Sequence, residues 1–185
     1  MPYYQYEIEE DEQENDEENE DEDDGKEPAM TEEMYEPAGT TVRFDADPFV
    51  KGVHDALVEK GITTVNCHYD GGYDEGFAHF DKALVNQTPL TTAELIALLK
   101  DGPILDPSLN AQRFAHFPPH ALESMFGEMA ATPVGVRIAA VLEEFAQKLA
   151  WELFGEGFGI GDYQMRGRFR ADLETGKLTD LKDGE

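Results

Sequence analysis

The chain has 185 residues, and its 41 acidic and 14 basic residues give a formal net charge of −27. This length is typical of one domain, and the shortage of lysine and arginine argues against binding nucleic acid by neutralising its phosphates. A single cysteine, Cys67, excludes an intramolecular disulfide. The first residues lack the basic and apolar regions of a secretory signal, and no apolar run approaches the ~18 residues that cross a bilayer. We therefore expect a cytoplasmic location and no membrane contact.

The negative charge is concentrated at the N-terminal end. Residues 1–40 contain 18 of the 41 acidic residues and one basic residue, Lys26, which leaves a net charge of −10 for residues 41–185. A run of like charges repels itself and cannot bury enough apolar surface to offset the entropy lost on ordering. We therefore predict a disordered acidic tail over residues 1–40, followed by a single folded domain over residues 41–185.

The folded region begins with signals for a helix and a hairpin. Asp47 and Pro48 suit the N-cap and first position of a helix, which Gly61 would end. Residues 62–70 alternate and are rich in β-forming side chains, so we expect a strand there and a returning strand over residues 77–85. The glycine- and acid-rich residues between these two strands predict a turn.

Helices follow in the middle of the chain. A capping box at residues 91–94 starts one helix, Asp106-Pro107 starts a short helical piece, and residues 120–131 form another helix. The longest helix follows an N-cap at Thr132 and ends near Phe154. Four apolar residues mark its buried stripe: Ile138, Leu142, Phe145 and Leu149. Trp151 would anchor its C-terminal end in the core.

The C-terminal part of the chain predicts a second hairpin. A glycine-rich loop over residues 155–161 precedes a strand over residues 163–173 and a short strand over residues 177–181. The loop runs from helix to strand, so it is not a dinucleotide-binding loop, and we interpret it as a cap that approaches another backbone closely. The fold class is therefore α+β: a small antiparallel sheet of about four strands, in two hairpins, packed against several helices.

Strand alternation sorts the side chains into two faces. Val65, Cys67 and Tyr69 share the face expected to be buried, so the only thiol is predicted to lie in the core. If all the strands join one sheet, its opposite face collects polar residues from three strands. These residues are His68, Asp70, His79, Asp81, Arg166, Arg168 and Arg170.

The arginines at alternating positions suggest an anion-binding or partner-binding surface. Guanidinium groups on one strand face can hold phosphate or carboxylate groups with paired hydrogen bonds. The residues of this hypothesis are Arg166, Arg168, Arg170, His68 and His79. The alternative is a solvated face on which the arginines pair with Asp70, Asp81 or the acidic tail.

A divalent-metal site is the second hypothesis. Asp70, Asp74 and Glu75 lie close together in the sequence and carry oxygen ligands. The segment departs from the calcium loop of an EF-hand, because Glu75 stands where that loop needs glycine and Gly72 stands at an oxygen-ligand position. The alternative is a hairpin turn in which glycines adopt positive φ and aspartate caps the backbone. We expect no cofactor.

Three segments resemble a family of uncharacterised bacterial domains. They are residues 69–76, with a DGxxDxG turn, residues 151–159, with a GxGxG loop, and the closing hairpin over residues 167–177. The likeness covers roughly residues 48–182 and leaves the acidic tail outside. Such domains recur in proteobacterial and mobile-element settings and have no assigned reaction, so the resemblance implies an accessory role without a catalytic residue to transfer.

These observations favour a non-enzymatic interaction module of bacterial or mobile-element origin, with a basic protein as the expected partner of this acidic chain. One alternative is a small metal-binding domain or metal-dependent enzyme that uses the acidic glycine-rich turns. Another is an acidic nucleic-acid mimic that acts on a DNA-binding or defence protein. We expect no direct binding of nucleic acid. We also expect the tail to compete with anionic ligands for the arginines.

Overall fold

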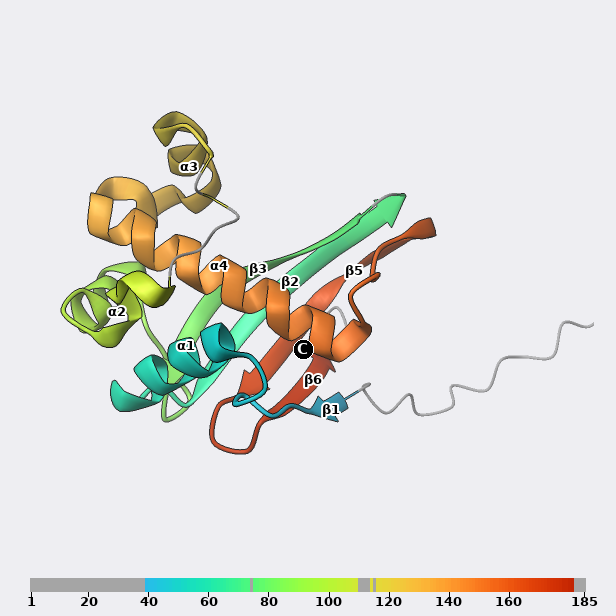
Figure 1. Cartoon of the computed structure of the whole chain (residues 1–185), viewed down its shortest axis with the longest axis horizontal. Coiled ribbons are helices and arrows are strands. Elements are labelled where there is room, and N and C mark those ends of the chain that lie inside the picture. The colour runs from blue at the N-terminus through green and yellow to red at the C-terminus, as the bar shows by residue number, and fades with distance from the viewer. Residues whose placement is uncertain (1–38, 74, 110–113, 115, 182–185) are drawn as a thin grey trace, which may run out of the picture. The chain divides into compact units, whose positions relative to one another are not determined.

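The computed structural model describes residues 39–73, 75–109, 114 and 116–181, all within the compact unit Glu36–Glu185. The predicted α+β class is confirmed, because one antiparallel sheet packs against four α-helices (Figure 1). Apart from its last two residues, the predicted tail lies outside the described residues.

The sheet has six strands rather than the four predicted, in the order β1-β6-β5-β2-β3-β4. The two predicted hairpins, β2–β3 and β5–β6, join through the antiparallel pair β2–β5. The additional strands, β1 and β4, have three and two residues, which is too short to leave an alternating pattern. The strands are β1 (Gly39–Thr41), β2 (Thr64–Tyr73), β3 (Glu75–Val85), β4 (Thr88–Pro89), β5 (Gly161–Asp172) and β6 (Lys177–Leu181).

The helices start where their capping residues predict. The Asp47 carboxylate accepts hydrogen bonds from the backbone N–H groups of Phe49 and Val50 at 2.7 and 3.1 Å. The capping box at residues 91–94 is formed, and Thr132 caps the longest helix. The α-helices are α1 (Pro48–Glu59), α2 (Thr92–Leu99), α3 (Pro119–Phe126) and α4 (Pro133–Phe154), and the 3₁₀ segments are η1 (Pro103–Leu105), η2 (Pro107–Leu109) and η4 (Gly127–Ala131).

The helix predicted over residues 120–131 is shorter than expected. It ends at Phe126 because Gly127 has a φ of +52°, outside the right-handed helical region, and the chain continues as η4. Among the described residues, no single helix is long and apolar enough to cross a membrane. Taken together, Pro119–Ala131 and Pro133–Phe154 reach that length and composition, but they form a bent pair with an angle of 111°.

The hydrophobic core lies between the sheet and the helices α1 and α4, which cover one of its faces (Figure 1). The buried stripe predicted on α4 is confirmed, because Ile138, Leu142, Phe145 and Leu149 are fully buried. The sheet contributes the face predicted by alternation, including Val65 and Cys67, which are also fully buried. The residues that alternate with them therefore point away from this core.

Most of the residues predicted to form the hairpin turn, 70–76, belong to the two strands instead. β2 extends to Tyr73 and β3 begins at Glu75, so Gly71 and Gly76 are paired residues of the sheet. The loop that follows α4 packs directly on this pair. A Cβ atom added to Gly159 would lie 2.7 Å from the Cα of Gly76 and 2.9 Å from the Cα of Gly71. The predicted close approach of this loop to another backbone is thus confirmed, and the backbone is that of the β2–β3 hairpin.

Side chains of α4 bond to the backbone of β3 where β4 does not reach it. β4 pairs only with Leu84 and Val85. Farther along β3, the Ala78 N–H donates to Gln147 Oε1 at 3.0 Å, and Gln147 Nε2 donates to the Gly76 carbonyl at 3.2 Å. The Phe80 N–H donates to Glu143 Oε1 at 3.1 Å. These bonds satisfy backbone groups that would otherwise lack partners and fix α4 against the hairpin.

Candidate functional site

The helices α1 and α4 cover one face of the sheet (Figure 1). The strand register brings the predicted polar residues together on the opposite face, which we call the polar face. In its central row, His68 of β2 lies between Arg168 of β5 and His79 of β3. In the next row, Asp70 pairs with Arg166. Together with Asp81 and Arg170, all seven residues that alternation predicts are present on this face.

The three arginines of β5 are exposed, and no described carboxylate lies within ion-pair distance of their guanidinium groups. Arg166, Arg168 and Arg170 form no ion pair with any residue that the structure describes. Arg170 Nε donates one long hydrogen bond, of 3.4 Å, to Asn66 Oδ1. Alternate residues of a strand lie roughly 7 Å apart, so the guanidinium groups form a row that is open to solvent.

The two histidines stack on each other, and each contacts a carboxylate. The ring centroids of His68 and His79 are 4.9 Å apart at an interplanar angle of 29°. His68 Nδ1 lies 2.5 Å from Asp81 Oδ1, and His79 Nδ1 lies 2.9 Å from Glu143 Oε2. Because an ionised carboxylate only accepts hydrogen bonds, both Nδ1 atoms are the donors.

Glu143 was not identified by sequence reasoning. It lies on α4 beside the buried stripe, and it reaches His79 around the exposed edge of β3. The same carboxylate accepts the Phe80 N–H, so it holds both the backbone and a side chain of β3. Helical spacing shows that Glu143 flanks the apolar stripe, but it does not reveal which strand lies next to that flank.

Asp81 raises the tendency of His68 to carry a positive charge. Their hydrogen bond holds the pKa of His68 above its ordinary value of 6.5, and partial burial opposes this effect. The carboxylates of Glu143 and Asp70 also raise the pKa of His68. A protonated His68 next to Arg168 would add a further positive charge to the row of arginines.

We expect the Asp81→Asn variant to lower the pKa of His68. Because the folded-state pKa lies above 6.5, the His68–Asp81 pair stabilises the fold fully below that pH and loses this contribution as the pH rises through the folded-state pKa. The charged groups facing His68 are Asp81, Glu143, Asp70 and, across the strand pair, Arg168. NMR titration of the His68 ring protons in both proteins measures the shift. An equal pKa in both would show that Asp81 is not its main cause.

The structure places two of the three residues of the metal hypothesis, Asp70 and Glu75, around one hollow. This shallow hollow has a volume of about 420 Å³, and Asp74 lies outside the described residues. Arg166 lines the same hollow, so its guanidinium opposes a divalent cation there. In the part of the chain that the structure describes, no three histidine, cysteine, aspartate or glutamate residues are arranged to hold a metal ion.

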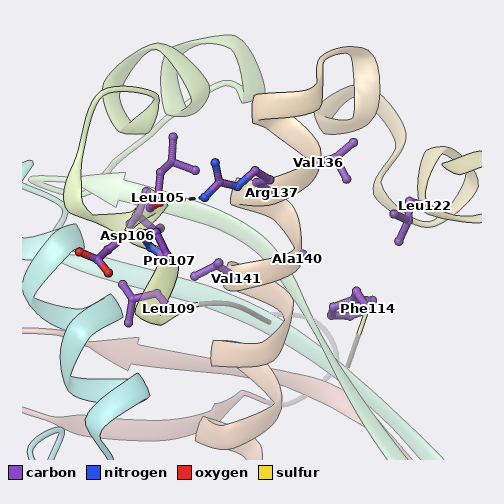
Figure 2. Close-up of a pocket in the computed structure, with 11 residues that line it drawn as sticks. Leu105, Asp106, Pro107, Leu109, Phe114, Leu122, Val136, Arg137, Ala140 and Val141 are labelled. Atoms are coloured by element: carbon purple, nitrogen blue, oxygen red, sulfur yellow. Dashed lines mark hydrogen bonds between the residues drawn. The ribbon is translucent and has the colours of Figure 1, made fainter. Parts of the chain in front are cut away.

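A separate hollow of about 340 Å³ lies between η1, η2 and the outer side of α4 (Figure 2). Most of its lining residues are apolar, and Phe114, Leu122 and Val136 line the side away from η1 and η2. Arg137 Nη2 donates a hydrogen bond of 2.8 Å to the Leu105 carbonyl at its rim. This bond connects α4 to η1. It gives Arg137 a structural role, so its position at the hollow does not imply a ligand.

Trp151 is not the buried anchor that the sequence predicts. It is 36% exposed on the side of α4, and Lys148 Nζ lies 5.9 Å from its ring centroid. The end of α4 is instead packed by Phe154, whose ring centroid lies 4.5 Å from that of Tyr69. The helical stripe of Phe145 and Leu149 turns away from position 151, which explains the error.

Cys67 is fully buried, as predicted, and burial raises the pKa of its thiol well above the usual value. A thiol that is neither ionised nor accessible is a poor nucleophile. We expect a thiol-specific disulfide reagent to leave the native protein unlabelled and to label one thiol per chain in denaturant. Rapid labelling of the native protein would show that the β2 face carrying Cys67 opens readily to solvent.

Comparisons of the chain with protein-family models, with curated proteins and with solved structures found no match.

Proposed function

We propose that this chain is a non-enzymatic interaction module whose polar face binds anionic groups of a partner protein. The observation that carries this proposal is the row of Arg166, Arg168 and Arg170, exposed and without a carboxylate partner among the described residues. An arginine that is already paired with a carboxylate of its own chain has few N–H groups left for a partner. An unpaired guanidinium group can still bind a carboxylate or phosphate group of another molecule.

The row of three arginines lies in a chain that is acidic overall, and this contrast supports a specific contact with a partner protein. A net charge of −27 attracts a partner that is basic overall and repels most anions at long range. The polar face reverses this sign locally, and His68 adds positive charge as the pH falls through its raised pKa. A basic partner that presents a few acidic or phosphorylated residues would match both features, which favours one orientation of docking.

Two defined probes test this proposal on the full-length chain: a glutamate decapeptide for carboxylates, and inorganic tripolyphosphate for phosphates. Binding is measured by NMR shifts of the Arg Nε–H signals and β5 backbone amides. We expect the variant with Arg166→Gln, Arg168→Gln and Arg170→Gln to bind at least one probe about tenfold more weakly than wild type, because each exposed ion pair contributes up to about 1 kcal/mol.

A matched variant removes three lysines on the helical side of the domain: Lys51→Gln, Lys60→Gln and Lys100→Gln. It changes the net charge by the same amount, so it separates local contact from overall repulsion. Measurements at about 10 mM and about 150 mM salt compare Debye lengths of about 30 Å and 8 Å and reveal competition by the acidic N-terminal segment. Equal loss of binding in the two triple variants would refute a site on the polar face.

A further inference from the structure

A hollow of about 330 Å³ lies at the edge of β3, between the C-terminal half of α4 and the loop that follows it. This volume is at the lower end of the range for small-molecule sites, ~300–1,000 Å³. The loop packs closely on the β2–β3 hairpin, so that Glu156 and Ile160 line the same hollow as Glu75 and Phe77. Residues from three separate segments of the chain thus meet around one hollow.

The lining combines negative charge with aromatic and apolar surface. Three of the lining residues are acidic, namely Glu75, Glu144 and Glu156, and none of the described lining residues is basic. Trp151 and Ile160 also line the hollow, and they are among the few large apolar side chains of the described chain that remain exposed, at 36% and 65%. Carboxylates and an aromatic ring that face the same space both attract cations.

One acidic group in this hollow has an unsatisfied oxygen. Glu144 Oε2 has almost no solvent-accessible surface and no hydrogen-bond partner among the residues that the structure describes. A buried carboxylate oxygen without a donor is costly, and such atoms are rare in native proteins. Its neighbours on α4 differ in this respect, because Glu143 and Gln147 both bond to β3. Glu144 is therefore not explained by the contact of α4 with the sheet.

The lining discriminates between classes of ligand. An anion would be repelled by the three carboxylates, and a neutral apolar ligand would bury them without supplying a donor. A hydrated metal ion would gain nothing from Trp151 or Ile160. An ammonium group on an aliphatic stem satisfies both parts of the hollow, because the stem packs on the apolar residues while the ammonium donates to carboxylates and lies near the indole ring.

We propose that this hollow binds an aliphatic ammonium group, supplied either by a lysine side chain of a partner or by a free polyamine. The site does not depend on the polar face, since none of the three arginines lines it. Failure of anion binding on the polar face would therefore leave this proposal standing, and the reverse also holds.

Binding can be measured directly, because Trp151 is the only tryptophan in the chain and its fluorescence reports on the hollow. The probes are N-acetyl-lysine-N′-methylamide for a protein side chain, spermidine for a free polyamine, and the norleucine analogue of the capped lysine, which lacks the ammonium group. We expect the fluorescence of the full-length protein to change with one or both of the first two probes and not with the third.

The variants Glu144→Gln and Glu156→Gln should each weaken binding about tenfold or more, because each removes one negative charge from the lining of the hollow. The control is Glu152→Gln, on an exposed position of α4 that does not line the hollow. All three variants have the same net charge and keep the acidic N-terminal segment. Non-specific attraction of polyamines to that segment is therefore equal in the three variants and does not affect their comparison. Glu144→Gln should unfold at the wild-type temperature or above it, because it replaces an unpartnered carboxylate.

The outcomes separate the two sources of the ammonium group. A response to capped lysine, with or without spermidine, supports recognition of a protein side chain, whereas a response to spermidine alone supports a free polyamine. An equal response in wild type and in the Glu144→Gln and Glu156→Gln variants would overturn the proposal. So would a response to the norleucine analogue as large as that to capped lysine, or no response to any probe.

Discussion

The Phe145→Ala variant should lose about 3–5 kcal/mol of unfolding free energy, the range for a large aromatic residue removed from a packed core. Phe145 is fully buried at the centre of the α4 stripe. Its ring centroid lies 6.5 Å from that of Phe44, which precedes α1, so the ring fills the space between the two helices and the sheet. Urea unfolding of wild type and variant measures the difference.

A matched change on the surface controls for the chemistry of the substitution. Phe117→Ala removes the same atoms from a side chain that is 43% exposed, and we expect it to cost less than half as much as Phe145→Ala. If Phe145→Ala does not fold, Phe145→Leu provides a smaller loss that can still be compared with wild type. Equal losses at positions 145 and 117 would contradict the packing described for α4.

The Gly159→Ala variant is expected to lose about 2–4 kcal/mol of unfolding free energy, for two reasons that act together. Gly159 has a φ of +77°, which an L side chain adopts only with strain. The new methyl group would also meet the Cα atoms of Gly76 and Gly71, and backbone atoms cannot rotate away as a flexible side chain does. Urea unfolding and amide hydrogen exchange over the β2–β3 hairpin measure the effect.

Gly157 supplies the control for this prediction in the same loop. A Cβ atom there would meet only Ile160 Cδ1, at 3.7 Å, which is ordinary van der Waals contact. We expect Gly157→Ala to change the unfolding free energy by less than about 0.5 kcal/mol. If the two variants proved equally stable, the loop would not be packed on the hairpin in solution.

Much of this fold could be predicted because its main elements are long and have two distinct faces. α4 carries a continuous apolar stripe, and β2 and β5 alternate strictly, so the polar face could be assigned before any pairing was known. Each of these predictions depends only on residues within one element. In the structure, His68 of β2 lies opposite Arg168 of β5, which agrees with the assignment of both residues to the polar face.

The errors arise where contacts between distant segments decide the structure. Residues 70–76 have the composition of a turn, but Gly71, Gly72 and Gly76 pair within the sheet, and Gly159 approaches two of them closely. β1 and β4 are held by their neighbours and have too few residues to show a period. Trp151 is expected in the core from its place at the end of the longest helix, whereas its position on α4 lines the hollow next to β3. None of these contacts can be inferred from local sequence alone.

The hydrogen bonds between α4 and β3 also bear on the association of this protein with copies of itself. An unpaired strand edge is a template on which another chain can add a strand, and such additions lead to fibres. On β3 this template is already occupied, because Gln147 and Glu143 bond to the backbone of Gly76, Ala78 and Phe80. An incoming strand would have to displace these two side chains and break their hydrogen bonds to the β3 backbone. The same helix that packs on the core thus also covers this part of the β3 edge, and strand addition there would cost these hydrogen bonds.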